Sequence, residues 1–204
     1  NTQDITAVEV NPASIDFVSD YTAYNGGLYD QASVRALVDE GRSLLRREDT
    51  AYDLIFLSQV VTLTNERLGY ALTENTIYTV EAFQDYLAHL TDDGYVALVM
   101  YDEITLTRAL STALAALRAQ GLTDTEAIQH VMAFVDTQSG KPIPLLMIRK
   151  SPLTREDSLS YLAVARQVGF QPLYLPGAYA QPPLDTIEAG THTFADVEAN
   201  SASD

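Results

Sequence analysis

Apolar and polar positions along the chain follow two periods that predict strands and helices in turn. Short apolar runs rich in β-branched residues predict strands, and apolar residues three or four positions apart predict helices. The predicted strands are 5–12, 34–38, 52–58, 95–101, 130–136, 144–150 and 170–175. The predicted helices are 13–23, 43–48, 76–90, 106–119 and 154–167. Strands that alternate with helices indicate an α/β fold with a mostly parallel sheet and right-handed crossovers.

Two features limit the fold classes that fit the sequence: the strand at 52–58, and the pair of strands at 130–136 and 144–150. Residues 52–58 are almost continuously apolar, which is typical of a parallel strand buried on both faces. The strands at 130–136 and 144–150 flank a short polar turn and predict an antiparallel hairpin. A parallel sheet with such a hairpin resembles the three-layer, Rossmann-like fold of S-adenosylmethionine-dependent methyltransferases. We expect this domain over 1–176 and a mobile or loosely docked tail over 177–204.

Charge limits the kinds of partner that the chain can have. The sequence has 12 basic and 28 acidic residues, and its formal net charge is −16. Such a surface repels phosphate backbones and anionic lipid headgroups, so we do not expect nucleic acid as a partner. A small cationic substrate such as an amine is compatible with it. The alternative is an acidic surface that serves only solubility.

Neither metal nor membrane is indicated. The chain has no cysteine, and its three histidines are far apart, so the sequence shows no metal-ligand spacing. No apolar run approaches the length of about 20 residues that crosses a bilayer, and no signal peptide is visible. We expect a cytoplasmic protein, or the cytoplasmic domain of a membrane protein.

Glu9 is the first candidate site residue, because it stands at the end of the first predicted strand. Ligands of open α/β sheets bind beyond the carboxyl ends of the strands. A carboxylate there can accept hydrogen bonds from the two hydroxyls of a ribose. The alternative is a solvated or capping glutamate. Asn11 and Pro12 follow as the predicted N-cap and first residue of a helix.

An ordered series of short motifs resembles the spermidine synthase-like proteins of the S-adenosylmethionine-dependent methyltransferase superfamily. The motifs are Val8-Glu9-Val10-Asn11-Pro12, Asp39-Glu40-Gly41-Arg42, Tyr52-Asp53-Leu54-Ile55, Leu72-Thr73-Glu74-Asn75, Tyr78-Thr79-Val80-Glu81-Ala82-Phe83 and Asp92-Asp93-Gly94. The resemblance implies that the chain binds S-adenosylmethionine or decarboxylated S-adenosylmethionine. By this resemblance Glu9 would bind the ribose hydroxyls, Asn11 would also contact the cofactor, and Glu40 would accept from the adenine amino group. Gly41 would let the backbone approach the base.

The same resemblance implies roles for residues after the strand at 52–58. Ser58 and Gln59 would also line the cofactor, and Glu74 and Tyr78 would face the substrate. Simpler alternatives exist for each kind of residue. Glu40 then belongs to a charged turn, Glu74 is a capping or solvent-facing acid, and Tyr78 is a core aromatic.

The sequence departs from the family pattern in two places. The family has a strand and a glycine-rich turn before the strand that carries Glu9, and both are missing from this sequence. We therefore expect this chain by itself to bind the cofactor weakly or not at all. The family also has an aspartate that takes a proton from the attacking amine, where this chain has Ser58 and Gln59. Neither is a general base at neutral pH, so no catalytic residue is assigned.

Three functions remain at this point. The leading hypothesis is a methyltransferase-like transferase domain with an unknown acceptor, since methyl transfer depends mostly on positioning. The alternative is a non-catalytic sensor or scaffold domain of a larger, membrane-associated protein. A nicotinamide dehydrogenase would suit Glu9 but not the hairpin. Because a sheet without its middle strand exposes strand edges, we also expect a homodimer.

Overall fold

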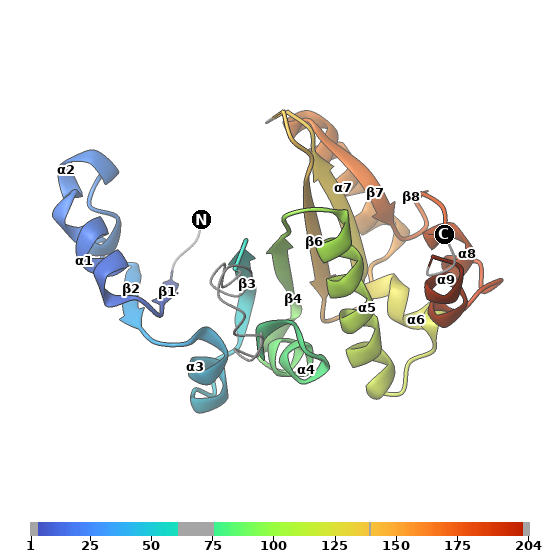
Figure 1. Cartoon of the computed structure of the whole chain (residues 1–204), viewed down its shortest axis with the longest axis horizontal. Helices are drawn as coiled ribbons and strands as arrows, with labels where there is room; N and C mark the ends of the chain where they lie inside the picture. The colour runs from blue at the N-terminus through green and yellow to red at the C-terminus, as the bar shows by residue number, and fades with distance from the viewer. Residues whose placement is uncertain (1–3, 61–75, 139, 202–204) are drawn as a thin grey trace, which may run out of the picture. The chain divides into compact units, whose positions relative to one another are not determined.

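The computed structural model describes residues 4–60, 76–138 and 140–201 (Figure 1). The chain forms two compact units, Asn1–Thr50 and Ala51–Asp204. Among the described residues, no helix combines the length and apolar content needed to cross a membrane. The single domain expected over 1–176 stays a prediction.

The Asn1–Thr50 unit is one βαβ crossover followed by a helix. Its elements are β1 (Ile5–Glu9), α1 (Pro12–Asp20), α2 (Thr22–Asn25), η1 (Leu28–Asp30), β2 (Val34–Val38) and α3 (Gly41–Arg47). Strands β1 and β2 are parallel, with Ile5 opposite Val34 and Glu9 opposite Val38. The Asn11 side chain accepts from the Ala13 amide at 3.1 Å and caps α1, and Pro12 opens that helix. This confirms the predicted start of the helix.

The Ala51–Asp204 unit is built on one mixed sheet. Its strands, in sheet order, are β3 (Tyr52–Ser58), β4 (Leu90–Val99), β6 (Ile143–Arg149), β5 (Val131–Asp136), β7 (Phe170–Leu175) and β8 (Tyr179–Ala180). Strands β3 and β4 are parallel, and the other neighbours are antiparallel. The predicted hairpin is confirmed as β5–β6. The sheet is mixed because β6 lies between β4 and β5, and β7 and β8 extend it in antiparallel fashion.

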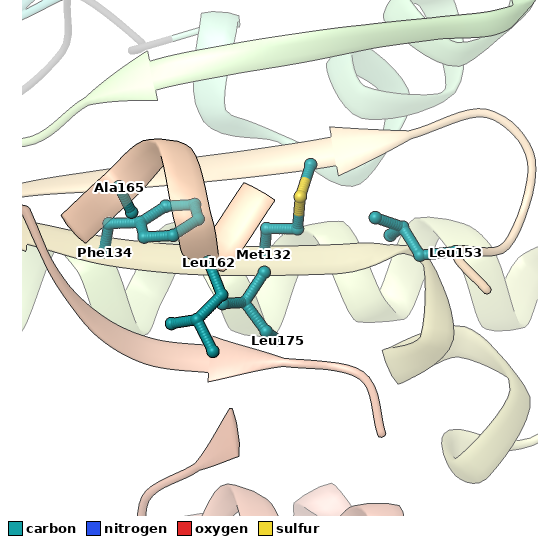
Figure 2. Close-up of a cluster of buried hydrophobic side chains, with 6 residues drawn as sticks. All are labelled: Met132, Phe134, Leu153, Leu162, Ala165 and Leu175. Atoms are coloured by element: carbon teal, nitrogen blue, oxygen red, sulfur yellow. The ribbon is translucent and has the colours of Figure 1, made fainter. Parts of the chain in front are cut away.

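Helices cover both faces of this sheet. The helices are η3 (Thr76–Tyr78), α4 (Val80–Ala88), α5 (Glu103–Ala119), α6 (Asp124–Ala127), η4 (Ile128–His130), α7 (Arg155–Val168), α8 (Leu184–Glu188) and α9 (Phe194–Ser201). Helix α5 packs against α4 and β6, and α7 packs against β7. Figure 2 shows the cluster between α7 and the strands, formed by Met132, Phe134, Leu153, Leu162, Ala165 and Leu175. Because successive strand residues point to opposite faces, Ala133 and Leu146 belong to the other face. This unit therefore has three layers.

The segment where the sequence predicts a tail carries secondary structure in this unit. Strand β8 pairs with β7, and α8 and α9 follow. Ile187 of α8 is fully buried and Phe194 is 2% exposed. The Phe194 amide also donates to Asp124 Oδ2 at 2.9 Å. Two apolar anchors and a hydrogen bond dock this segment, since burial of such side chains is favourable.

Strand β4 begins five residues earlier than predicted. Asp92-Asp93-Gly94 is a sequence typical of a turn, but in the structure it lies in a bulge of this strand. Tyr52 pairs with Leu90, but Leu54 pairs with Tyr95, so the extra residues of β4 are accommodated between them. Gly94 lies in this bulge. A Cβ at Gly94 would lie 2.7 Å from the Tyr52 carbonyl oxygen and 2.9 Å from Thr91 Oγ1. Only glycine fits there without a shift of backbone.

Gly94→Ala should therefore destabilise the protein. The new methyl group meets the backbone of β3 rather than a flexible side chain, so we expect a loss of about 1–3 kcal/mol in the free energy of unfolding. Urea denaturation followed by circular dichroism measures this loss. Gly41→Ala is the control, because no atom lies within 4 Å of its added Cβ. Equal unfolding midpoints for the two variants would contradict the role given to Gly94.

Candidate functional site

The carboxyl ends of β1 and β2 bring three predicted site residues to one edge of the Asn1–Thr50 unit. Glu9 is the last residue of β1, and its carbonyl oxygen accepts from the Asp39 amide at 3.1 Å. Glu40 follows directly. Glu9 Oε1 accepts from the Asn11 amide at 2.9 Å. Parallel pairing thus places Glu9, Asn11 and Glu40 at the edge where ligands of α/β sheets bind.

Glu40 is the N-cap of α3. Its Oε1 accepts from the Arg42 amide at 3.0 Å, and its Oε2 accepts from the Ser43 amide and hydroxyl, each at 2.7 Å. Partial burial acts to raise the pKa of Glu40, but these hydrogen bonds and Arg42 outweigh it, and the pKa lies below its usual value. Both carboxylate oxygens are engaged locally. The adenine role predicted for Glu40 would have to use their remaining lone pairs.

Asp39 is also held by its own unit. Its carboxylate forms an ion pair with Arg47 of α3, and its Oδ1 accepts from the Glu40 amide at 2.8 Å. The hydrogen bond from Arg47, with that from the amide, lowers the pKa of Asp39. The Glu9 carboxylate differs, because its Oε2 accepts no hydrogen bond from any residue that the structure describes. Glu9 is the acid at this edge with an uncommitted oxygen.

Gly41 leaves the backbone after Glu40 accessible. No atom lies within 4 Å of the position that a Cβ would take at this residue, and Gly41 is exposed. The approach of a planar group to this backbone, which the sequence predicts, is therefore sterically possible. The role of Gly41 itself stays a prediction.

The carboxyl ends of β3 and β4 form a second edge, in the Ala51–Asp204 unit. Ser58 ends β3 opposite Val99 of β4, and the Gln59 amide donates to the Val99 carbonyl at 3.0 Å. The Tyr101 hydroxyl donates to the Gln59 carbonyl at 2.6 Å. The side chains of Ser58 and Gln59 are exposed and make no hydrogen bond within the described residues. This edge offers a hydroxyl and an amide rather than a carboxylate.

Tyr78 lies beside Tyr101. Burial raises the pKa of the Tyr78 hydroxyl, and the neighbouring Tyr101 raises it further. The turn that carries Tyr78 is tied to α4, since the Tyr86 hydroxyl donates to the Ile77 carbonyl at 2.9 Å. Tyr78 is only half-buried, so it belongs neither to the deep core nor to open solvent. The edge in this unit thus gains Tyr101, which the sequence predicts as the last residue of a strand and to which it gives no role.

The predictions for Glu74 and for metal ligands remain to be compared with the structure. Glu74, the predicted substrate-side acid, lies outside the described residues, as does Glu66. Across residues 4–60, 76–138 and 140–201, no group of three or more His, Asp or Glu side chains could hold a metal ion. Each edge, taken by itself, presents polar groups that can form hydrogen bonds to an organic ligand.

Comparison with solved structures identifies the fold. No protein-family model matches the chain, and no curated protein matches it in sequence. A spermidine synthase in complex with the transition-state analogue AdoDATO is similar, with 12% identity and a TM-score of 0.53 over 93% of this chain and 60% of that one. The chain has a Rossmann-like methyltransferase fold. Spermidine synthase from Thermotoga maritima gives the same values.

A third similar structure is a probable spermidine synthase from Corynebacterium glutamicum. It has 20% identity and a TM-score of 0.50, over 86% of this chain and 62% of that one. The chain therefore spans about three fifths of the length of the spermidine synthases that it resembles. These similarities confirm the predicted α/β fold class. At such identities they concern the fold, and each residue's role still has to be argued from the chain itself.

The cap at Glu40 should make α3 sensitive to pH. Because the pKa of folded Glu40 is lowered, its contribution to stability is present above the unfolded value near 4.5 and is lost as the pH falls through the folded value. We expect hydrogen-exchange protection of the Arg42 and Ser43 amides, corrected for intrinsic rates, to fall in that range. Glu40→Ala should remove about 1 kcal/mol of helix stability at neutral pH. Asp16→Asn, an exposed change on α1, is the control; an equal loss there would argue against the cap.

Proposed function

We propose that this chain is an S-adenosylmethionine-binding, methyltransferase-like transferase domain. The observation that carries the proposal is the Glu9 carboxylate, which ends a parallel strand and keeps one oxygen uncommitted. A vicinal diol such as that of a ribose donates two hydrogen bonds to such a carboxylate, and charge-assisted bonds are the strong ones. The fold supports the proposal, because it is that of enzymes acting on such ligands.

The remaining residues fit the ligand by their chemistry. Glu40 and Gly41 suit an adenine, since one offers carboxylate lone pairs and the other an open backbone. Asn11, Ser58 and Gln59 provide further polar groups at strand ends. We propose S-adenosylmethionine or decarboxylated S-adenosylmethionine as the ligand. When bound, it supplies an electrophilic carbon next to a sulfonium.

The transfer step requires little from the side chains that the structure describes. Ser58 and Gln59 are neutral, so they can orient an acceptor but not take up a proton at neutral pH. Orientation and exclusion of water are the main contributions of a protein to this type of displacement. The acceptor is a small molecule, and the net charge of −16 favours a cationic amine. Glu74 and Tyr78 are proposed to face it.

A non-catalytic role is the second candidate. It is favoured by the neutral Ser58 and Gln59, at the position where the resemblance implies a proton-accepting aspartate. In this case the domain would keep the fold and act as a sensor or scaffold within a larger, membrane-associated protein. We propose a cytoplasmic location for the domain in both cases.

Titration with S-adenosylmethionine and its decarboxylated analogue, by calorimetry on the full-length protein, tests the proposal. We expect Glu9→Ala to weaken binding about tenfold or more, because two charge-assisted hydrogen bonds to the ribose are lost. Asp16→Asn, in the same unit, should leave the affinity unchanged. If neither compound binds the wild-type protein more tightly than about 1 mM, roughly −4 kcal/mol, the transferase proposal fails and the scaffold remains. Unchanged binding in Glu9→Ala would remove the role of Glu9 alone.

We also propose a homodimer. Within the Ala51–Asp204 unit, β3 is an edge strand, and its Leu54 and Phe56 are 46% and 58% exposed. Open apolar strand edges favour pairing with another chain. Sedimentation velocity should give the mass of two chains, and Phe56→Lys should shift it to that of one. A monomeric wild-type protein would exclude this assembly.

A further inference from the structure

Tyr101 holds a left-handed piece of backbone at the end of β3. We propose that Tyr101 is a positioning residue, whose hydroxyl fixes the backbone of Gln59 so that the Ser58 and Gln59 side chains are presented to the ligand. This inference rests on the proposed function and adds to it a residue that the sequence motifs do not include.

The backbone at Gln59 requires support. Its φ of 47° is the one positive φ at a non-glycine residue in the described part of the chain. A residue with a Cβ is disfavoured in the left-handed region, and glutamine lacks the short polar side chain that lets asparagine adopt it. Such conformations persist where the surroundings determine them, and they gather at functional sites.

Hydrogen bonds on both sides of Gln59 supply that support. Its amide donates to the Val99 carbonyl at 3.0 Å, and its carbonyl accepts from the Tyr101 hydroxyl at 2.6 Å. Both partners come from the end of β4 and the residues just after it. The hydrogen bond from the Gln59 amide continues the parallel ladder beyond Ser58. The hydrogen bond from Tyr101 is the one that a side chain makes. We call these two hydrogen bonds the clamp on Gln59. Because a substitution can remove the Tyr101 hydroxyl but not a backbone group, Tyr101 is the part of the clamp that can be tested.

Tyr101 is itself rigidly held. The preceding Met100 is 4% exposed, and its amide donates to the Pro144 carbonyl at 2.8 Å. The following Asp102 opens α5 through a capping box with Thr105. Half-buried Tyr78 lies beside the tyrosine. Tyr101 therefore lies between the end of a strand and the start of a helix, and the residues on both sides of it are held by hydrogen bonds. A hydroxyl in such a position can restrain a neighbouring segment.

The clamp acts on backbone that carries two polar side chains. Ser58 and Gln59 are exposed, make no hydrogen bond to other described residues and stand at the carboxyl end of a parallel pair. Ligands of this type of sheet bind at such ends. Because the Tyr101 hydroxyl holds the backbone at the strand end that carries these side chains, its loss should cost affinity through lost preorganisation.

The test uses Tyr101→Phe in the full-length protein, which removes one hydroxyl. Tyr95→Phe is the matched control, since Tyr95 is a half-buried tyrosine on β4, the strand that precedes Tyr101, at a distance from the carboxyl end of that strand. We expect Tyr101→Phe to weaken S-adenosylmethionine binding about five- to tenfold and to lower the exchange protection of the Gln59 amide. The midpoint of urea unfolding should move no more than in Tyr95→Phe, which separates positioning from general stability.

A second background tests the role of the left-handed backbone. Asparagine adopts this conformation more readily than glutamine. In a Gln59→Asn background, the further change Tyr101→Phe should therefore weaken binding less than twofold. An equal loss in both backgrounds would overturn the clamp, because the tyrosine would then act in another way.

The outcomes separate this inference from the proposed function. If the wild-type protein binds and Tyr101→Phe binds equally well, the inference is wrong and the proposed function stands. If the wild-type protein does not bind S-adenosylmethionine, the proposed function fails and the ligand-positioning role fails with it. Unchanged protection of the Gln59 amide in Tyr101→Phe would overturn the clamp independently of any ligand.

Discussion

Parallel pairing of strands is the constraint on which the candidate site depends. Two parallel pairs occur in the described residues, β1 with β2 and β3 with β4. In each pair both strands end at the same edge, so residues that are far apart in the sequence become neighbours. Glu9 and Asp39 meet in this way in one unit, and Gln59 and Tyr101 in the other. An antiparallel partner in either place would have sent these side chains to opposite ends. The antiparallel part of the second sheet extends the core instead, and the cluster in Figure 2 belongs to it.

Helix capping competes with ligand binding for the acids at these edges. In an α/β fold a strand end is also the start of a helix, where free amides need acceptors. Asn11, Glu40 and Asp102 each serve as such an acceptor, and Asp39 is held by Arg47. A sequence motif does not distinguish an acid that caps a helix from one that awaits a ligand, because both stand at the same place. The hydrogen-bond geometry does so, and it leaves Glu9 as the carboxylate with unused capacity.

Patterns among neighbouring residues predict much of the fold. The features that they do not predict depend on contacts between residues far apart in the sequence. Residues 34–38, 52–58 and 170–175 form strands with the predicted bounds, because β-branched and aromatic residues favour extended backbone. The predicted burial of 52–58 on both faces is wrong within the Ala51–Asp204 unit, where β3 lies at the edge of the sheet and Leu54 and Phe56 are exposed. The capping box of α7 is also a local signal, since Thr154 and its partner Asp157 are three residues apart. The bulge at Gly94 has no local signal, because Asp-Asp-Gly is typical of a turn and only the pairing with β3 makes it part of a strand. Tyr101 gave no signal, because its partner lies 42 residues away.

The similarity to spermidine synthases therefore concerns the fold and not the chemistry of individual residues. At 12–20% identity, what is retained is the arrangement of strands and helices. One edge, in the Asn1–Thr50 unit, carries the Glu9 carboxylate with its uncommitted oxygen, and another, in the Ala51–Asp204 unit, carries the neutral side chains of Ser58 and Gln59. Groups of both kinds form hydrogen bonds to hydroxyls and amides. A strained backbone kept in place by a tyrosine hydroxyl is consistent with hydrogen bonding of this kind, because it serves orientation rather than acid–base chemistry.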